Sequence, residues 1–116
     1  MTPNQFRKLT LALPDTEERT HHHHPDFRLH GQSFATMGYP DAACSMLILT
    51  PEQQAEFMHD RPVVFSPAAG AWGRQESTLI ALAKATSAIL RPAIAAAHQN
   101  ALASLASKKK PHRKLQ

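Results

Sequence analysis

Apolar residues recur at helical spacing near both ends of the chain. Phe6, Leu9 and Leu13 fall on one face of a predicted helix over residues 2–13. Towards the C-terminus, apolar positions three or four residues apart predict a long helix over about residues 86–105. The members of this stripe are Leu90, Ile94, Ala97, Ala101 and Leu105. Each helix therefore presents one face that must be buried.

Capping patterns mark where two of the helices begin. The letters TPNQ follow Met1, and TPEQ occupies residues 50–53. Threonine followed three residues later by glutamine forms a capping box, and proline suits the first helical position. The second pattern predicts a helix that ends near Asp60. In the C-terminal helix, Pro92 is awkward, so we expect the helix either to start near it or to kink after one turn.

Between the helices the pattern changes to short apolar or alternating segments, which are typical of strands. The clearest pair is a hairpin with Gly31 as the first of two loop residues, which favours a type II′ turn because glycine accepts a positive φ. This register pairs Leu29 with Phe34 and Phe27 with Thr36. The predicted strands are residues 26–30, 33–37, 44–49, 63–66 and 77–83, and residues 17–24 form a short strand or a strand-like approach.

The order of elements is helix-strand-strand-strand-helix-strand-strand-helix. Sequential strands with short connections predict an antiparallel sheet of about five strands with the helices on one face. The fold class is therefore α+β, with two layers. We expect a single domain over residues 1–106, followed by a flexible basic tail over residues 107–116.

The charge of the chain is concentrated in that tail. Of 13 lysines and arginines, five lie in the last nine residues, and the remaining eight are balanced by nine acidic residues. The five are Lys108, Lys109, Lys110, Arg113 and Lys114. Such a run can neutralise phosphates and give salt-sensitive binding to nucleic acid. It can equally be a solubilising terminus.

Several protein classes are disfavoured by what the sequence lacks. No run approaches the roughly 18 apolar residues of a membrane span, and the first residues do not resemble a secretory signal. We therefore expect a cytoplasmic protein with no membrane partner. The single cysteine, Cys44, excludes an intrachain disulfide and a cysteine-based zinc site. Phosphate loops, dinucleotide fingerprints and nucleophile elbows are absent, so an enzyme is less favoured and no cofactor is expected.

Four consecutive histidines, residues 21–24, offer candidate metal ligands. On a strand, His22 and His24 point to one side, and such a pair can bind nickel, copper or zinc. Asp26 or His30 could supply a third ligand. The alternative interpretation is a polar strand whose histidines are partly solvated.

Two further residue groups offer contacts to an anion or a base. Trp72 lies in a glycine-containing loop, where it could stack on a base while Arg74 reaches an anion. Alternatively, Trp72 packs against the edge of the sheet. Arg28, on the polar side of its strand, could bind phosphate or carboxylate. It could equally pair with Asp26 or Glu76.

Three segments together resemble the MmcQ/YjbR family of small bacterial proteins, over about residues 4–105. They are LALP at residues 11–14 with two glutamates, HPDFRL at residues 24–29 with FAT at 34–36, and PAAGAWGR at residues 67–74. The resemblance implies a frataxin-like (CyaY-like) fold. It also implies the DNA-binding label that members usually carry, because their hairpins resemble the wings of winged DNA binders.

The chain departs from the family pattern at two places. Family hairpins commonly carry Gly-Lys at the turn, whereas this chain has Gly31-Gln32. The family often continues Gln-Gly-Trp-Thr after the third segment, whereas residues 75–78 read QEST. A cation and a second tryptophan are lost, which weakens the case for DNA contacts by the folded body.

Three hypotheses follow. The first is weak, non-specific DNA association by a monomer or weak homodimer, with affinity from the tail. Its contact residues are Arg28, His30, Trp72, Arg74, Lys108, Lys109, Lys110 and Arg113. The second is a small-ligand or metal-binding protein that uses the sheet face around His22, His24, Arg28 and His30. The third is a protein-interaction module.

Overall fold

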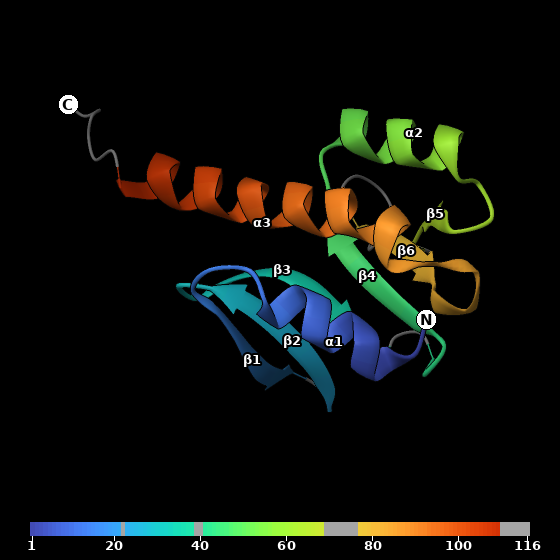
Figure 1. Cartoon of the computed structure of the whole chain (residues 1–116). Helices are drawn as coiled ribbons and strands as arrows, with labels where there is room; N and C mark the ends of the chain where they lie inside the picture. Colours follow the sequence, from blue (N-terminus) through green and yellow to red (C-terminus); the bar gives the residue numbers. More distant parts are fainter. Residues whose placement is uncertain (22, 39–40, 69–76, 110–116) are drawn as a thin grey trace.

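Six strands and three α-helices make up the part of the chain that the structure describes (Figure 1). This computed structural model describes residues 1–21, 23–38, 41–68 and 77–109, apart from the side chains of residues 21, 108 and 109. The helices are α1 (Pro3–Leu11), α2 (Pro51–Asp60) and α3 (Ser87–Lys109), and a short 3₁₀ turn, η2 (Leu82–Lys84), precedes α3. The strands are β1 (Thr16–His21), β2 (His24–Leu29), β3 (Gln32–Met37), β4 (Cys44–Ile48), β5 (Phe65–Pro67) and β6 (Ser77–Ala81).

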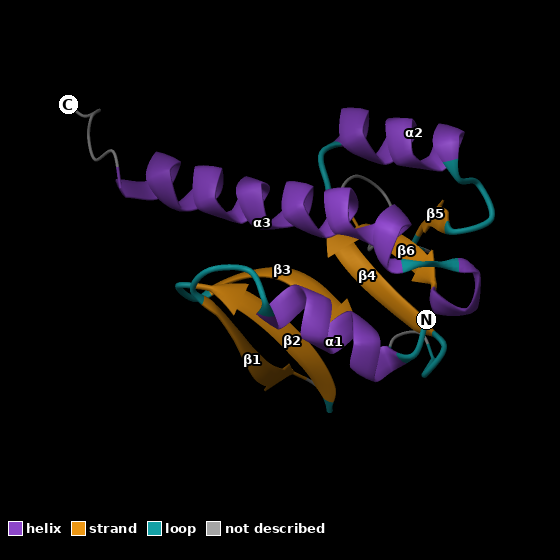
Figure 2. Cartoon of the chain, in the orientation of Figure 1, coloured by secondary structure: helices purple, strands orange, loops and turns teal. Residues whose placement is uncertain are grey.

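All neighbouring strands are antiparallel, in the order β1-β2-β3-β4-β6-β5. Helix α3 packs on β2, β3 and β4, α1 contacts β1 and α3, and α2 contacts β5 (Figure 2). The α+β class and the antiparallel sheet with helices on one face are confirmed. Both predicted capping boxes are present as well, at Thr2 with Gln5 and at Thr50 with Gln53.

The sheet has one strand more than the expected five, because β1 is a full strand. It pairs with β2 from Thr16 opposite Leu29 to His21 opposite His24. As an edge strand it is exposed and therefore carries charged side chains, which hid it from an apolar pattern. Of the two alternatives for residues 17–24, a short strand or a strand-like approach, the structure thus shows a regular strand over Thr16–His21.

The β2–β3 turn differs from the predicted type II′ turn. Leu29 pairs with Gln32, so the loop residues are His30 and Gly31, with φ of 48° and 84°. Positive φ at both central residues is the type I′ pattern, which matches the twist of the flanking strands. The predicted register is wrong for the same reason.

A bulge then changes which residues share a face. Phe27 pairs with Ala35, whereas Arg28 pairs with Ser33, so Phe34 is the extra residue. The bulge lets Phe34 turn towards α3, where its ring lies edge-on to His98 with centroids 5.5 Å apart. In the predicted register, Ala35 and Met37 lie on the face that points away from the core. In the structure, both are buried in the core.

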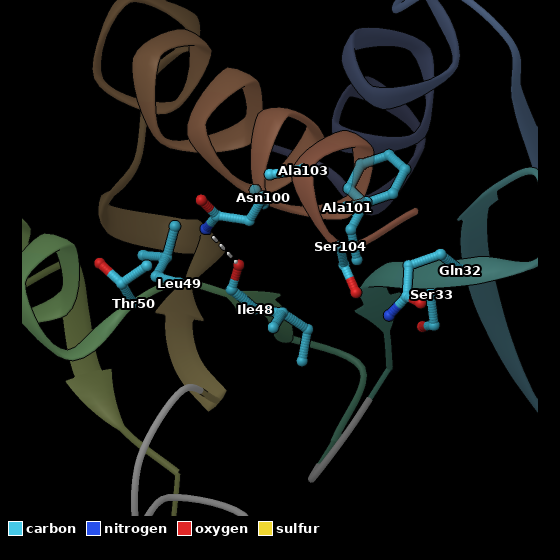
Figure 3. Close-up of a pocket in the computed structure, with 11 residues that line it drawn as sticks. Gln32, Ser33, Ile48, Leu49, Thr50, Asn100, Ala101, Ala103 and Ser104 are labelled. Carbon is cyan, nitrogen blue, oxygen red and sulfur yellow. Dashed lines mark hydrogen bonds between the residues drawn. The ribbon is translucent and has the colours of Figure 1, made fainter. Parts of the chain in front are cut away.

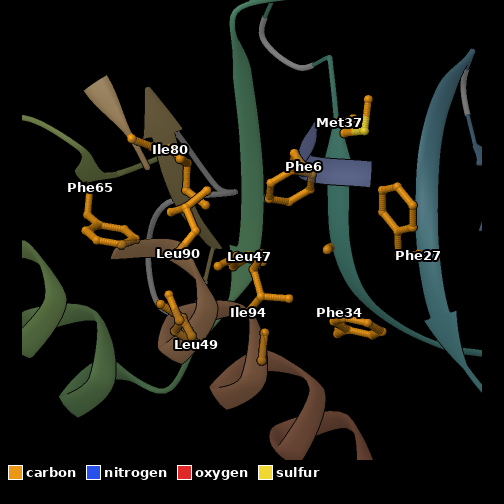
Figure 4. Close-up of a cluster of buried hydrophobic side chains, with 14 of the residues drawn as sticks. Phe6, Phe27, Phe34, Met37, Leu47, Leu49, Phe65, Ile80, Leu90 and Ile94 are labelled. Carbon is orange, nitrogen blue, oxygen red and sulfur yellow. The ribbon is translucent and has the colours of Figure 1, made fainter. Parts of the chain in front are cut away.

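The core lies between the sheet and the helices (Figure 4). The predicted stripe on α3 is buried at four positions, Leu90, Ile94, Ala97 and Ala101, and half-buried at Leu105. Phe6 of α1 is fully buried and meets Phe27 of β2 edge to face, with centroids 6.1 Å apart. Phe57 brings α2 onto Phe65 of β5. The ring of His98 forms a 2.9 Å hydrogen bond with the carbonyl of Pro14, in the segment between α1 and β1.

Helix α3 is longer than predicted. It begins one turn before Pro92 and continues to Lys109, so residues 107–109, assigned to the tail, continue the helix. At 1.5 Å per residue, its 23 residues span about 35 Å. Its C-terminal turns extend past the ends of β2 and β3 (Figure 1).

Candidate functional surfaces

The sheet face opposite the helices carries two rows of polar side chains. Residues paired across strands share a face, and β2 turns Phe27 and Leu29 to the core. Asp26 and Arg28, which alternate with them along the strand, therefore point to the other side. One row holds Arg19, Asp26 and Thr36, and the other holds Glu17, Arg28 and Ser33. We call these six residues the polar sheet face.

Arg28 and Asp26 form an ion pair at the centre of this face. The Nε of Arg28 donates to Oδ2 of Asp26 at 2.5 Å, and the hydroxyl of Ser33 donates to Oδ1 at 2.5 Å. The Asp26 side chain is 5% exposed and that of Arg28 is 28% exposed. Of the two partners considered for Arg28, Asp26 is the one the structure shows, and Glu76 lies outside the described residues.

Two more arginines of the folded body are paired with carboxylates. Arg19 contacts Oε1 of Glu17 through Nε at 2.9 Å and Nη2 at 2.7 Å. Arg7 of α1 donates from Nε to Oε1 of Glu18 at 2.9 Å and from Nη2 to Oε2 at 3.2 Å. Its Nη1 donates to Oδ1 of Asn4. The cations near β1 and β2 are therefore largely balanced, as the composition of the body indicates.

The candidate histidines do not form a single cluster in the described part of the chain. His24 lies at the start of β2, whereas His30 sits in the turn at its other end. The Nε2 of His30 is 3.7 Å from Oδ2 of Asp15, and both side chains are well exposed. No group of three or more histidine, cysteine or acidic side chains among the described residues could hold a metal ion. His22 lies outside them, so the His22–His24 pair stays a prediction.

Trp72 and Arg74 also lie outside the described residues, and the contacts expected of both stay predictions. The basic run is divided. Lys108 and Lys109 belong to the last turn of α3, whereas Lys110 and Arg113 follow the described chain. The backbone thus places the start of the run beyond the sheet, at the end of the longest helix (Figure 1).

A cavity of about 360 Å³ lies under the C-terminal half of α3, between this helix and the ends of β3 and β4 (Figure 3). Phe34, Leu49 and Ala97 contribute apolar walls, and Asn100 and Ser104 contribute polar groups. The amide nitrogen of Asn100 donates to the carbonyl of Ile48 at 3.2 Å and to Oε1 of Gln53 at 2.7 Å.

Sequence reasoning missed this cavity, although a signal was present. Asn100 and Ser104 are polar residues four positions apart, next to the apolar stripe of α3. Gln32 and Ser33 of β3 line the same cavity as Ala103 and Ser104. The β2–β3 turn and the C-terminal part of α3 therefore lie at the same end of the molecule.

The comparisons with known proteins agree with this architecture. A family model described as YjbR matches residues 11–100. The chain belongs to the YjbR family. A solved structure of Deinococcus radiodurans protein DR2400, with the family domain DUF419, is similar with a TM-score of 0.65 at 17% identity. The match covers 97% of this chain and 83% of that one. The resemblance seen in the sequence is confirmed.

These matches show the family and the fold, and no curated protein matches the chain. Among the residues that the structure describes, no helix is long and apolar enough to cross a membrane.

Cys44, at the start of β4, is half-buried. Burial raises the pKa of its thiol, and the nearby charge of Asp41 raises it further. The thiol is therefore protonated at neutral pH, which does not favour a nucleophilic role.

Proposed function

We propose that this YjbR-family protein associates weakly and non-specifically with nucleic acid through the basic C-terminal end of α3. The supporting observation is the place of the charge. Helix α3 runs past the sheet, and Lys108 and Lys109 form its last turn (Figure 1). Lys110, Arg113 and Lys114 follow in the sequence.

The charges of the folded body support the same proposal, because they are largely balanced. Its arginines at positions 7, 19 and 28 are paired with carboxylates, so they contribute little net positive potential. A phosphate backbone is attracted by unbalanced cations, whose binding releases condensed counterions. The run at the end of α3 is the largest unbalanced group in the sequence. The turn at His30 lies at the same end and could contact the backbone beside it.

The experiment is fluorescence anisotropy with a labelled DNA duplex at low salt. One variant replaces Lys108, Lys109, Lys110, Arg113 and Lys114 by glutamine and keeps the chain length. A control variant replaces exposed cations near the N-terminal end of α3, namely Arg61 at the end of α2, Lys84 of η2 and Arg91 of α3. We expect the first variant to lose at least about tenfold in affinity and the control to change about twofold or less. Equal losses in both variants would contradict the proposal.

A further inference from the structure

We infer that Arg28 is the anchor of a second site, a phosphate-binding site on the polar sheet face. This site does not depend on the proposed function, because it lies on the sheet and not at the end of α3. Nucleic-acid association can fail and this site can still bind a small phosphate compound.

The inference starts from how Arg28 is held. Its Nε donates to the Asp26 carboxylate, and the other oxygen of that carboxylate accepts from Ser33. Both Asp26 oxygens are thus occupied, and the carboxylate is nine-tenths buried or more. A guanidinium has five N–H donors in a fixed plane. Anchoring one of them through a buried carboxylate fixes the direction of the rest.

Among the residues that the structure describes, no hydrogen-bond partner is found for either Nη atom of Arg28, and 28% of its side chain is exposed. This distinguishes Arg28 from Arg7, whose Nε, Nη1 and Nη2 all donate to neighbouring side chains. Two parallel Nη–H bonds to two oxygens are the geometry in which arginine binds phosphate. An arginine that is already oriented loses less side-chain entropy when it binds.

The neighbouring charges set the expected strength. Arg19 lies opposite Asp26 and adds a second cation, whereas Glu17 lies opposite Arg28 and opposes an anion. Oε1 of Glu17 already accepts from Arg19, which limits this repulsion. Ser33 and Thr36 are the polar neighbours on β3. Because these charges balance, we expect a doubly charged phosphate group to bind in the millimolar range and a singly charged carboxylate to bind more weakly.

The test is a titration of the full chain with inorganic phosphate, followed by two-dimensional ¹H–¹⁵N NMR, against sodium chloride at matched ionic strength. We expect saturable shifts at the Arg28 Nε–H and at the amides of Ser33 and Thr36. The key variant is Arg28→Lys, which keeps a cation beside Asp26 but removes the planar fork. It should weaken phosphate binding at least about fivefold. The matched control, Arg91→Lys on exposed α3, should not change it.

Several outcomes would overturn the inference. One is that phosphate shifts only the signals of residues 107–116, or that sodium chloride at the same ionic strength causes the same shifts as phosphate. Another is that Arg28→Lys binds phosphate as tightly as the original chain, or that acetate binds as tightly as phosphate. If Arg28→Lys does not fold, the double variant Asp26→Asn/Arg28→Gln removes both charges together and leaves no buried unpaired ion. Retention of phosphate binding by the double variant would also contradict the site.

Discussion

Arg28 donates a hydrogen bond from Nε to the almost fully buried carboxylate of Asp26, two residues earlier on the same face of β2. The pair lies on the sheet face opposite the helices, and Ser33 supplies the second hydrogen bond to the carboxylate. A buried carboxylate is stable only when it is paired, and here the Arg28 cation and the Ser33 hydroxyl supply the partners.

Removing the arginine should therefore cost stability. Arg28→Ala leaves the Asp26 carboxylate buried without its cation, and we expect a loss of about 1–3 kcal/mol in the free energy of unfolding. The value stays below that of a fully buried pair because part of the guanidinium reaches solvent. Urea unfolding followed by circular dichroism measures it. Arg91→Ala, an exposed position on α3, should change stability by no more than about 0.5 kcal/mol. Equal costs for the two would mean that the ion pair contributes nothing.

The packing of α3 predicts a contrast within one helix. Ile94 is 1% exposed and lies in the core, whereas Leu102 is 46% exposed on the same helix. Ile94→Ala removes buried methyl groups and leaves a cavity, so it should destabilise the protein by about 2–5 kcal/mol. Leu102→Ala should cost less than about 1 kcal/mol. The same urea unfolding experiment shows which variant loses more stability. Similar losses in both would contradict the exposed position of Leu102 and indicate that it is buried in an interface.

The β2–β3 turn predicts an effect of backbone conformation alone. Gly31 has φ of 84°, and an added Cβ would meet no atom within 4 Å. Gly31→Ala should therefore destabilise the fold by about 1–2 kcal/mol, because an L-residue resists this left-handed conformation. His30→Asn is the control. Its φ of 48° suits asparagine, so we expect a change within about 0.5 kcal/mol. Thermal unfolding of both variants separates strain from lost contacts, and a neutral Gly31→Ala would refute the type I′ turn.

Cys44 provides a pH-dependent readout. Burial and then the charge of Asp41 raise the pKa of its thiol, so less thiolate is present at a given pH than in an unperturbed cysteine. Alkylation by iodoacetamide at pH 7.5 should be slower than that of a fully exposed cysteine with an unperturbed pKa, and the rate should increase as the pH rises. Asp41→Asn removes a nearby negative charge and should speed the reaction at the same pH. An unchanged rate in this variant would show that burial alone controls the thiol.

Much of the fold could be predicted from the sequence because its local signals agree with one another. The two capping boxes and the stripe from Leu90 to Ala101 each specify a helix that the structure contains. The β2–β3 register could not be predicted, because it depends on a positive φ at a histidine and on a bulge at Phe34. Neither leaves a pattern in the order of apolar residues.

The candidate sites were less predictable, because they depend on contacts between residues on different strands. The sequence offered Arg28 two partners and could not choose between them. Asp26 holds its guanidinium, and Ser33 on the neighbouring strand holds the Asp26 carboxylate in turn. The cavity under α3 likewise needs Asn100 and Gln32, 68 residues apart in the sequence, to line the same space. This placement is set by the packing of the helix on the sheet.

The measurement that tests the central proposal most directly is the salt dependence of DNA binding, with and without the basic end of α3. The full chain and a chain that ends at Ser107 are compared by anisotropy between 20 and 200 mM salt. If the five basic residues that follow Ser107 carry the contact, the plot of log K against log salt should have a negative slope in the full chain, with a magnitude of no more than about 4–5. In the shortened chain the slope should be near zero. A shortened chain with the original affinity and slope would contradict the proposal and place the binding surface on the folded body.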